Sequence, residues 1–285
     1  MAIESAIAQI RDRETLDLPD PVGAAIRYAL SGGGKRLRGI LVLAAYRAAG
    51  GREDASRIGA SVEIVHTYSL VHDDLPCMDD DDMRRGRLAT HRAHTVAVAT
   101  AAGAAMIPLA ARAAYQGGRH LRLPETACCT IVKVLMQGAG AGGMIGGQLL
   151  DLAGEGVALT RDDLDSIHTA KTGALIAASV MVGGIAAGAS QDQLDALEYF
   201  GERIGLAFQI MDDVLDVTGT TDQLGKTAGR DVTLRKSTYP AMLGVEGAVN
   251  EAKWLVADGC DALGLEGLLS SDLRALAGFI VSRSH

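Results

Sequence analysis

Apolar residues recur at helical spacing through most of the chain. In the segment 54–75, for example, Val62, Val65, Ser69 and His72 fall in one register of a helix. Alternating β-branched runs bounded by turns are missing, so the strand signals are weak. With Gly and Pro as helix breakers, the pattern predicts helices at about 3–12, Pro19 to Leu30, 37–48, 54–75, 91–115, 124–150, 161–187, 192–217, 238–257 and 271–282.

No internal repeat of fixed period and no Pro- or Ser-rich linker divides these elements. Thr160-x-x-Asp163 is a capping-box signature at the start of the 161–187 helix. The sequence therefore predicts an all-α protein, a single-domain bundle of about ten helices that spans residues 1–285.

Composition narrows the class of protein. Hydrophobic residues make up 48% and charged residues 22% of the chain, an ordinary balance for a globular protein. The net charge of −8 argues against nucleic acid as a partner. The four cysteines form no C-x-x-C pair and have no metal-ligand spacing, which fits free thiols in a reducing cytoplasm.

Two uncharged runs, Ala93 to Ala111 and Thr172 to Gln191, are long enough to cross a bilayer. Both consist largely of small residues, and the second begins beside Lys171. We expect central helices of a cytoplasmic protein with no stable membrane insertion, and a membrane span is the lesser alternative. Charged residues near the start, such as Glu4 and Arg11, argue against a signal peptide.

Six aspartates lie within ten residues, from Asp73 to Asp82, and Arg84 and Arg85 follow them. Crowded carboxylates raise one another's pKa unless a cation lies among them. Mg²⁺ in proteins is typically held by one or two carboxylates together with substrate phosphates. Arginine adds planar forks that suit phosphate oxygens. The stretch predicts a metal–diphosphate site, and the alternative is a solvated acidic loop.

Within this stretch, Pro76 lacks an amide hydrogen and disfavours helix at Leu75. The backbone is therefore expected to open there, so that Asp73 and Asp79 reach one ion although they are six residues apart.

A second acidic cluster places Asp212 and Asp216 one helical turn apart, with Asp213 between them. Ile204, Phe208, Asp212 and Leu215 follow the spacing of a buried face, where a carboxylate is costly unless it is paired or bound to metal. The two clusters are predicted to face each other across a bundle and to hold several Mg²⁺ ions and a diphosphate.

At these motifs the sequence resembles the short-chain trans-isoprenyl diphosphate synthases, specifically the bacterial farnesyl diphosphate synthase (geranyltranstransferase) type. The resemblance runs from about residue 20 to the C-terminus and covers several separated motifs in family order. It implies helices around a central cavity, a homodimer, and Mg²⁺ as cofactor, with Mn²⁺ as an alternative ion. The metal ligands that it implies are Asp73, Asp74, Asp79, Asp212 and Asp216.

The implied reaction joins isopentenyl diphosphate head-to-tail to dimethylallyl and then geranyl diphosphate, through an allylic cation, and yields farnesyl diphosphate. For the isopentenyl diphosphate the resemblance implies Gly34, Lys35, Arg38, His66 and Arg85. The glycines before Lys35 also place free amides at a helix start, although a solvated helix start is as good a reading of that run alone. By itself, His66 would more often be a core histidine.

For the allylic diphosphate the resemblance implies Asp73, Asp79, Arg84, Lys171, Thr172, Gln209, Lys226 and Lys236, and of these Arg84, Lys171, Thr172 and Gln209 are the catalytic candidates. Lys171 lies on an otherwise apolar stripe, so a lysine that extends to water is the competing reading.

Chain length is expected to depend on Tyr68, five residues before Asp73, together with Ser69. In the family a bulky aromatic residue at this position goes with a C15 product, whereas core packing alone is the simpler interpretation of Tyr68.

The sequence departs from the family pattern at Gly39, Ala89 and Ala104-Ala105.

The alternatives to a farnesyl diphosphate synthase are a C20 or C10 synthase, a non-catalytic subunit of a heteromeric synthase, an acidic Mg²⁺- or Ca²⁺-binding protein, and a terpene cyclase. The cyclase is disfavoured because few aromatic residues are present to guide its cations.

Overall fold

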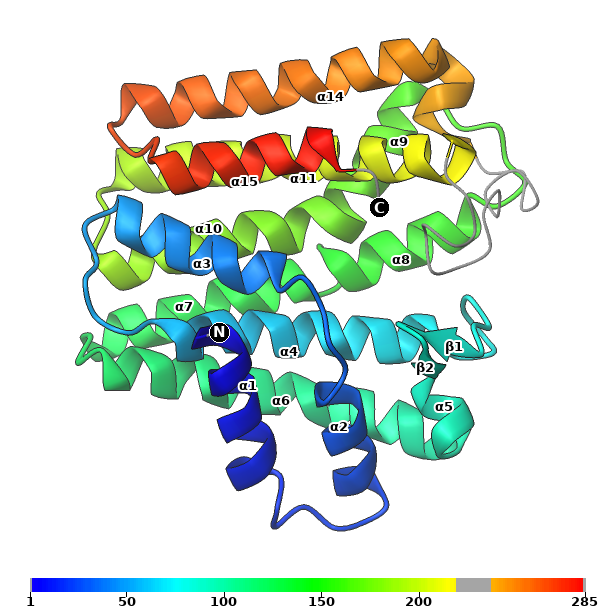
Figure 1. The fold of residues 1–285 in the computed structure, drawn as a ribbon, viewed down its shortest axis with the longest axis vertical. Coiled ribbons are helices and arrows are strands. Elements are labelled where there is room, and N and C mark those ends of the chain that lie inside the picture. The colour runs from blue at the N-terminus through cyan, green and yellow to red at the C-terminus, as the bar shows by residue number, and fades with distance from the viewer. Residues whose placement is uncertain (1, 219–236, 284–285) are drawn as a thin grey trace. The chain divides into compact units, whose positions relative to one another are not determined.

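The computed structural model describes residues 2–218 and 237–283. The all-α class predicted from sequence is confirmed (Figure 1). The elements are α1 Ala2–Glu14, α2 Val22–Leu30, α3 Leu37–Ala48, α4 Ser56–Asp73, β1 Met83–Arg84, β2 Arg87–Leu88, α5 Thr90–Ala93, α6 Val96–His120, α7 Glu125–Ala139, α8 Met144–Ala153, α9 Arg161–His168, the π-helix η1 Thr169–Gly173, α10 Ala174–Ala187, α11 Gln191–Thr218, α14 Tyr239–Leu265 and α15 Ser271–Ser282.

The chain forms two compact units. Unit 1 consists of Met1–Leu43 and Glu53–Val132. Its centre is α4, which packs along α6, while α1 and α2 also lie against α4 (Figure 1). The α4 helix is buried on nearly all sides, and even Glu63 is only 2% exposed. Consequently α4 shows almost no amphipathic pattern, as expected of a helix surrounded by others.

Unit 2 consists of Ala44–Arg52 and Lys133–His285. Its longest element is α11, which packs against α10, α14 and α15 (Figure 1). Phe200, Ile204 and Leu197 on α11 are completely buried. Gly201 allows this packing, because a Cβ there would lie 2.9 Å from a methyl group of Val180.

Several helices predicted as continuous are interrupted. The 91–115 prediction is divided into α5 and α6 at His94 and Thr95, where Thr95 caps α6 by accepting a hydrogen bond from the Val98 amide. The 124–150 prediction is divided at the glycine-rich residues 140–143. The helix predicted at 161–187 is interrupted by the π-helix η1. Its predicted capping box at Thr160 and Asp163 is present. Helix periodicity does not detect such breaks, because the register on either side is little changed.

Three helical stretches have the length and hydropathy of a membrane span: Val96–His120, Glu125–Ala153 and Arg161–Ala187. The third is largely covered by protein, with 67% of its most apolar window buried. The first two have less than half of that window buried, and among their exposed side chains are the apolar residues Val96, Ile145 and Leu149.

Candidate active site

In unit 1, the first acidic cluster begins where α4 ends. The helix stops at Asp73, as predicted from Pro76, and the chain then turns back on itself. The Asp79 amide donates a hydrogen bond to the Asp73 carbonyl at 2.8 Å, and the Asp80 amide bonds to the Leu75 carbonyl. Asp73 and Asp79 are therefore brought together by backbone hydrogen bonds.

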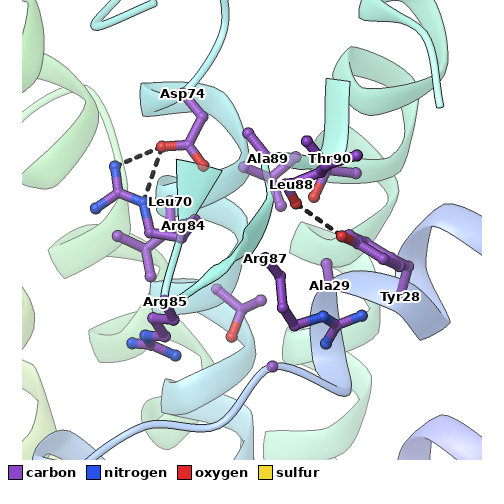
Figure 2. Close-up of a pocket in the computed structure, with 13 residues that line it drawn as sticks. Tyr28, Ala29, Leu70, Asp74, Arg84, Arg85, Arg87, Leu88, Ala89 and Thr90 are labelled. Carbon is purple, nitrogen blue, oxygen red and sulfur yellow. Dashed lines mark hydrogen bonds and ion pairs between the residues drawn. The ribbon is translucent and has the colours of Figure 1, made fainter. Parts of the chain in front are cut away.

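Asp74 has a different environment from its neighbour Asp73. Its side chain is 3% exposed and accepts a hydrogen bond from Nε of Arg84 at 2.9 Å, while Nη2 of the same guanidinium contacts the same oxygen (Figure 2). Burial raises the pKa of Asp74, an effect that Arg84 only partly offsets. Burial would lower the pKa of Arg84, but the hydrogen bond and charge of Asp74 raise it overall. This carboxylate is thus engaged in orienting Arg84.

A small hairpin that the sequence did not predict positions the two arginines. Its strands, β1 and β2, pair antiparallel across Arg85 and Gly86, whose φ angles are +53° and +73°. Two positive φ angles are characteristic of the type I′ turns that fit the twist of a hairpin. The guanidinium of Arg85 donates to the Gly33 carbonyl. A Cβ on Gly34 would lie 2.8 Å from that guanidinium, so only glycine fits there without a shift.

His66 lies close enough to Arg85, and to Arg38 at the start of α3, for both charges to act on its ring. Burial lowers the pKa of His66 well below its ordinary value, and the charges of Arg38 and Arg85 lower it further. Burial likewise lowers the pKa of Arg85. Gly34, Arg38, His66 and Arg85 therefore lie together in unit 1. Lys35, on the same segment as Gly34, is exposed.

Arg36 was not predicted as a substrate-binding residue, and in the structure it has a structural role near Gly34 and Arg38. It is buried with φ +51°, and it pairs with Glu4 at 2.7 Å.

Tyr68 and Ser69 precede Asp73 on α4. Tyr68 is 5% exposed and meets the His72 ring edge-on, with 5.1 Å between ring centroids. Burial, assisted by the charge of Asp73, raises the pKa of Tyr68 to about 12. His72 in turn bonds to the Thr100 carbonyl of α6 at 3.1 Å. The hydroxyl of Ser69 donates to the His66 carbonyl.

A small pocket in unit 1 lies between α2, α4 and the hairpin (Figure 2). Its cavity volume is about 50 Å³, and the Tyr28 hydroxyl donates to the Leu88 carbonyl at its edge. Arg87 lies over the Tyr28 ring at 4.2 Å and donates to Ser31. A cavity of this volume has room for a few water molecules.

In unit 2, Lys171 and Thr172 belong to η1. A π-helical turn in an α-helix often marks a functional site. Two glycines allow this turn: a Cβ on Gly147 of α8 would collide with the Lys171 backbone nitrogen, and a Cβ on Gly205 of α11 would lie 2.5 Å from the Gly173 Cα. The backbone of η1 thus lies in close contact with both α8 and α11, and these contacts fix the backbone position of Lys171 and Thr172.

The side chains on η1 have specific partners. Nζ of Lys171 lies 2.6 Å from a carboxylate oxygen of Asp151 on α8. The Thr172 hydroxyl donates to Oε1 of Gln209 on α11 at 2.8 Å. The Lys171 side chain is therefore part of a polar site and does not simply extend to water.

The three aspartates of the second motif lie in three environments. Asp213 is buried, contacts Nε2 of His168 at 3.3 Å, and accepts the Tyr239 amide at the start of α14. Asp216 is also buried. Asp212 is half exposed and pairs with Arg283 at 2.8 Å.

Five residues of this site were not predicted from the sequence: Gln148, Asp151, His168, Tyr239 and Arg283. Asp151 had a detectable signal, since it follows the apolar pair Leu149-Leu150 in a helix that also presents Gln148. Gln148 is 7% exposed, and neither atom of its amide has a partner among the described residues. A buried amide of this kind is costly unless it has a hydrogen-bond partner from outside the described residues.

Two candidates, Lys226 and Lys236, lie outside the described residues. The first aspartate cluster is in unit 1 and the second in unit 2, so the prediction that they face each other stays a prediction.

Within 2–218 and 237–283, no group of three His, Cys, Asp or Glu side chains is arranged to hold a metal. The donors are nevertheless of the kind that Mg²⁺ prefers, namely carboxylate oxygens supplemented by substrate phosphates.

Comparison with known proteins identifies the family of this chain. Residues 19–258 match the polyprenyl synthetase family. The farnesyl diphosphate synthase of Bacillus subtilis is 38% identical over 95% of this chain and 92% of its own, and geranylgeranyl pyrophosphate synthase 4 of Arabidopsis thaliana is 38% identical over 95% and 74%. A solved geranyltransferase of Helicobacter pylori, complexed with magnesium and isoprenyl diphosphate, is 29% identical, with a TM-score of 0.82 over 99% of this chain and 97% of that one.

The fold and these comparisons define an all-α prenyltransferase. More particularly, the chain belongs to the polyprenyl synthetase family, as the sequence motifs indicated.

Proposed function

We propose that this chain condenses isopentenyl diphosphate with dimethylallyl diphosphate and then with geranyl diphosphate, and that its product is farnesyl diphosphate. The observation that carries the proposal is the hydrogen bond from the Asp79 amide to the Asp73 carbonyl, which brings these two residues together at the end of α4, where the charge of Asp73 also acts on Arg84. The chain is 38% identical to a farnesyl diphosphate synthase over nearly its whole length, which supports the same activity.

The allylic diphosphate would be held through Mg²⁺ by Asp73 and Asp79, and by Asp212 and Asp216 of the second motif. When bound, Mg²⁺ neutralises the charge that develops on a departing diphosphate. Several ions, and Mn²⁺ in place of Mg²⁺, are part of the proposal. Asp74, which was also predicted as a ligand, is assigned here to holding Arg84, because its buried carboxylate already carries that guanidinium.

The second diphosphate, that of isopentenyl diphosphate, is assigned to Gly34, Lys35, Arg38, His66 and Arg85. Four of these residues lie together in unit 1, and the guanidinium of Arg85 is next to Gly34. Because His66 stays neutral, the positive charge of the site comes from arginine and lysine, and the ring can donate one hydrogen bond to a phosphate oxygen.

In the proposed reaction, the C–O bond of the allylic substrate breaks and its electron pair leaves with the diphosphate. Arg84 and Lys171 stabilise that leaving group, and Lys226 and Lys236 are assigned to it as well. Thr172 and Gln209, joined by their hydrogen bond, would present oxygen dipoles to the allylic cation.

The alkene of isopentenyl diphosphate then attacks the cation, and a proton is lost to the departing pyrophosphate. Water must be excluded, because it would trap the cation.

Product length is assigned to Tyr68 and Ser69, with the buried Tyr68 ring blocking the growing tail. A C20 product is the second candidate, because a geranylgeranyl pyrophosphate synthase is equally similar in identity. A C10 synthase and a non-catalytic subunit are the further alternatives.

The whole chain is proposed to act as one polyprenyl synthase domain in a cytoplasmic homodimer. The support is the family match, which runs continuously through both units, and the exposed apolar residues of α6 and of the α7–α8 stretch. We assign these residues to protein contacts in the dimer and not to a membrane.

The decisive experiment incubates the purified full chain with labelled isopentenyl diphosphate, dimethylallyl diphosphate and MgCl₂, and separates the products by chain length. C15 diphosphate that disappears when a chelator is added supports the proposal. A chain that makes no prenyl diphosphate, with or without Mg²⁺, would refute it. A C20 or C10 product would instead establish one of the alternatives.

A further inference from the structure

The last described residue of the chain, Arg283, lies on the second aspartate motif. It follows α15, and its amide donates to the Phe279 carbonyl. Although it lies so near the C-terminus, its side chain is only 6% exposed. One nitrogen of the guanidinium pairs with Oδ1 of Asp212 at 2.8 Å and also donates to the Phe208 carbonyl, and the group lies over the Phe208 ring at 3.7 Å.

These contacts are specific to a planar cation. A guanidinium over an aromatic face gains a cation–π interaction, and its separate N–H groups serve a carbonyl and a carboxylate at once. The contacts join the end of α15 to the middle of α11, within unit 2. Asp212 remains 40% exposed on its other side, so the carboxylate is both neutralised and still accessible.

This arrangement has a consequence for metal binding. A Mg²⁺ ion bound to Asp212 would lie about 2 Å from a carboxylate oxygen. Two cations on one carboxylate are then only a few ångström apart, and their repulsion is strong at a partly buried position. The arginine and the ion therefore weaken each other's hold on Asp212.

We propose that Arg283 is a tethered cation that holds Asp212 until Mg²⁺ and a diphosphate replace it, so that metal loading and release of the C-terminal end form one equilibrium. The inference rests on the proposed function, which makes Asp212 a metal ligand. Because such linkage is reciprocal, whatever loosens Arg283 must strengthen metal binding by the same factor.

The test is a titration of the full-length protein with MgCl₂ at a fixed concentration of inorganic pyrophosphate, followed by the change in Tm. Arg283→Met keeps much of the side-chain length and removes the charge. We expect its half-maximal MgCl₂ concentration to fall about fivefold, the lower end of ordinary coupling between sites. Arg274→Met, on an exposed position of α15, is the matched control and should leave the midpoint unchanged.

Each variant is compared with its own metal-free Tm, so a loss of stability does not obscure the midpoint. Should Arg283→Met fail to fold, Arg283→Lys provides the test. A lysine keeps the charge but loses the planar fork, so we expect a smaller fall in the midpoint. An unchanged or higher MgCl₂ midpoint in the variant that folds would overturn the inference, because the arginine would then assist the metal or be indifferent to it.

A second readout follows the arginine itself. Trypsin cleaves after Arg283, and intact-protein mass spectrometry detects this cleavage as the loss of the residues that follow it. We expect Mg²⁺ with pyrophosphate to accelerate this cleavage, and slower or unchanged cleavage contradicts the proposal. If the unsubstituted chain shows neither a Mg²⁺-dependent Tm nor condensation, the proposed function fails as well. If it shows both and only the Arg283 results disagree, the inference alone fails.

Discussion

At the scale of single residues, the departure at Gly39 has a physical explanation. The Gly39 amide donates a hydrogen bond to the buried Glu63 carboxylate at 2.8 Å. A Cβ on Gly39 would lie 3.1 Å from the Glu63 side chain and from the Gly59 carbonyl. Proline, the residue that the family resemblance implies at this position, has no amide hydrogen to donate. In this chain the glycine and Glu63 therefore form a matched pair.

We expect Gly39→Pro to lower the free energy of unfolding by about 1–3 kcal/mol, the cost of leaving a buried acceptor without its donor. Urea unfolding measures this change. Gly39→Ala is the control, because it adds the Cβ but keeps the amide hydrogen. A proline variant at least as stable as the alanine variant would show that the Glu63 hydrogen bond contributes nothing.

The Tyr68 ring gives a prediction about the product. It is buried against His72 and lies one and a half turns before Asp73. Tyr68→Ala removes the ring, and the expected result is a shift from C15 to longer prenyl diphosphates, measured by product chromatography. Tyr46→Ala, a buried tyrosine of unit 2, serves as control. An unchanged C15 product would remove Tyr68 from its proposed role.

His66 gives a prediction about pH. Its pKa is lowered by burial and by Arg38, whereas in the unfolded chain it is about 6.5. Above that pH the ring is neutral in both states. As the pH falls below it, the unfolded chain takes up a proton that the folded chain resists, so folding stability declines.

His66→Gln should make the free energy of unfolding less dependent on pH below about 6.5, because glutamine does not titrate there. The unsubstituted chain gives the reference slope. Urea unfolding at several pH values measures both proteins, and identical slopes for the two would contradict a lowered pKa of His66.

At the scale of elements, η1 shows how the fold places the site. A Cβ on Gly205 would come within 2.5 Å of the Gly173 backbone, whereas a Cβ on Gly173 itself would meet nothing nearer than 3.7 Å. A larger side chain therefore fits at Gly173 but not at Gly205, although the two glycines lie on elements that contact each other.

We expect Gly205→Ala to lower the free energy of unfolding by about 1–3 kcal/mol, the usual cost of overpacking, and to lower kcat because η1 carries Lys171 and Thr172. Gly173→Ala, the control, should be neutral or stabilising, since alanine is the better helix former. The measurements are urea unfolding and steady-state kinetics. Equal effects of the two substitutions would show that the close approach of α11 to η1 is not what matters.

Helix periodicity and turn residues in the sequence were enough to predict most helices and the opening at Pro76. They did not predict η1, because a π turn depends on contacts with Gly147 and Gly205 that are distant in sequence. The hairpin at Arg85 and Gly86 was missed because its two-residue strands are too short to show alternation.

For the site, charged residues in apolar surroundings were recognisable, as with Lys171. The sequence does not show which partner each charge takes. Asp74 and Asp212 look equivalent in their motifs. In the structure, however, Asp74 pairs with Arg84, whereas Asp212 pairs with Arg283. Those pairings depend on tertiary structure.

At the scale of the whole molecule, the exposed apolar residues of α6 bear on assembly. On α6, Ala97, Ala101, Ala104 and Pro108 are exposed and lie on one stripe of the helix. Small residues allow close approach of another surface, and a charge in their midst would be left unpaired.

We expect the unsubstituted chain to sediment at about twice its mass of 29.6 kDa, as a homodimer. Ala104→Arg should shift it toward the monomer, because the arginine would have to be buried without a partner. Ala275→Arg, at an exposed position of α15, is the control and should stay dimeric. Analytical ultracentrifugation distinguishes these outcomes, and a dimeric Ala104→Arg variant would place the interface elsewhere.

The hydrogen bond between the Asp79 amide and the Asp73 carbonyl also bears on how this protein can evolve. Side chains take no part in that bond, and Cys77, at the tip of the intervening loop, is exposed. Mutations at Cys77 should therefore accumulate at little cost to the enzyme. The loop can then change at this position while Asp73 and Asp79 stay together.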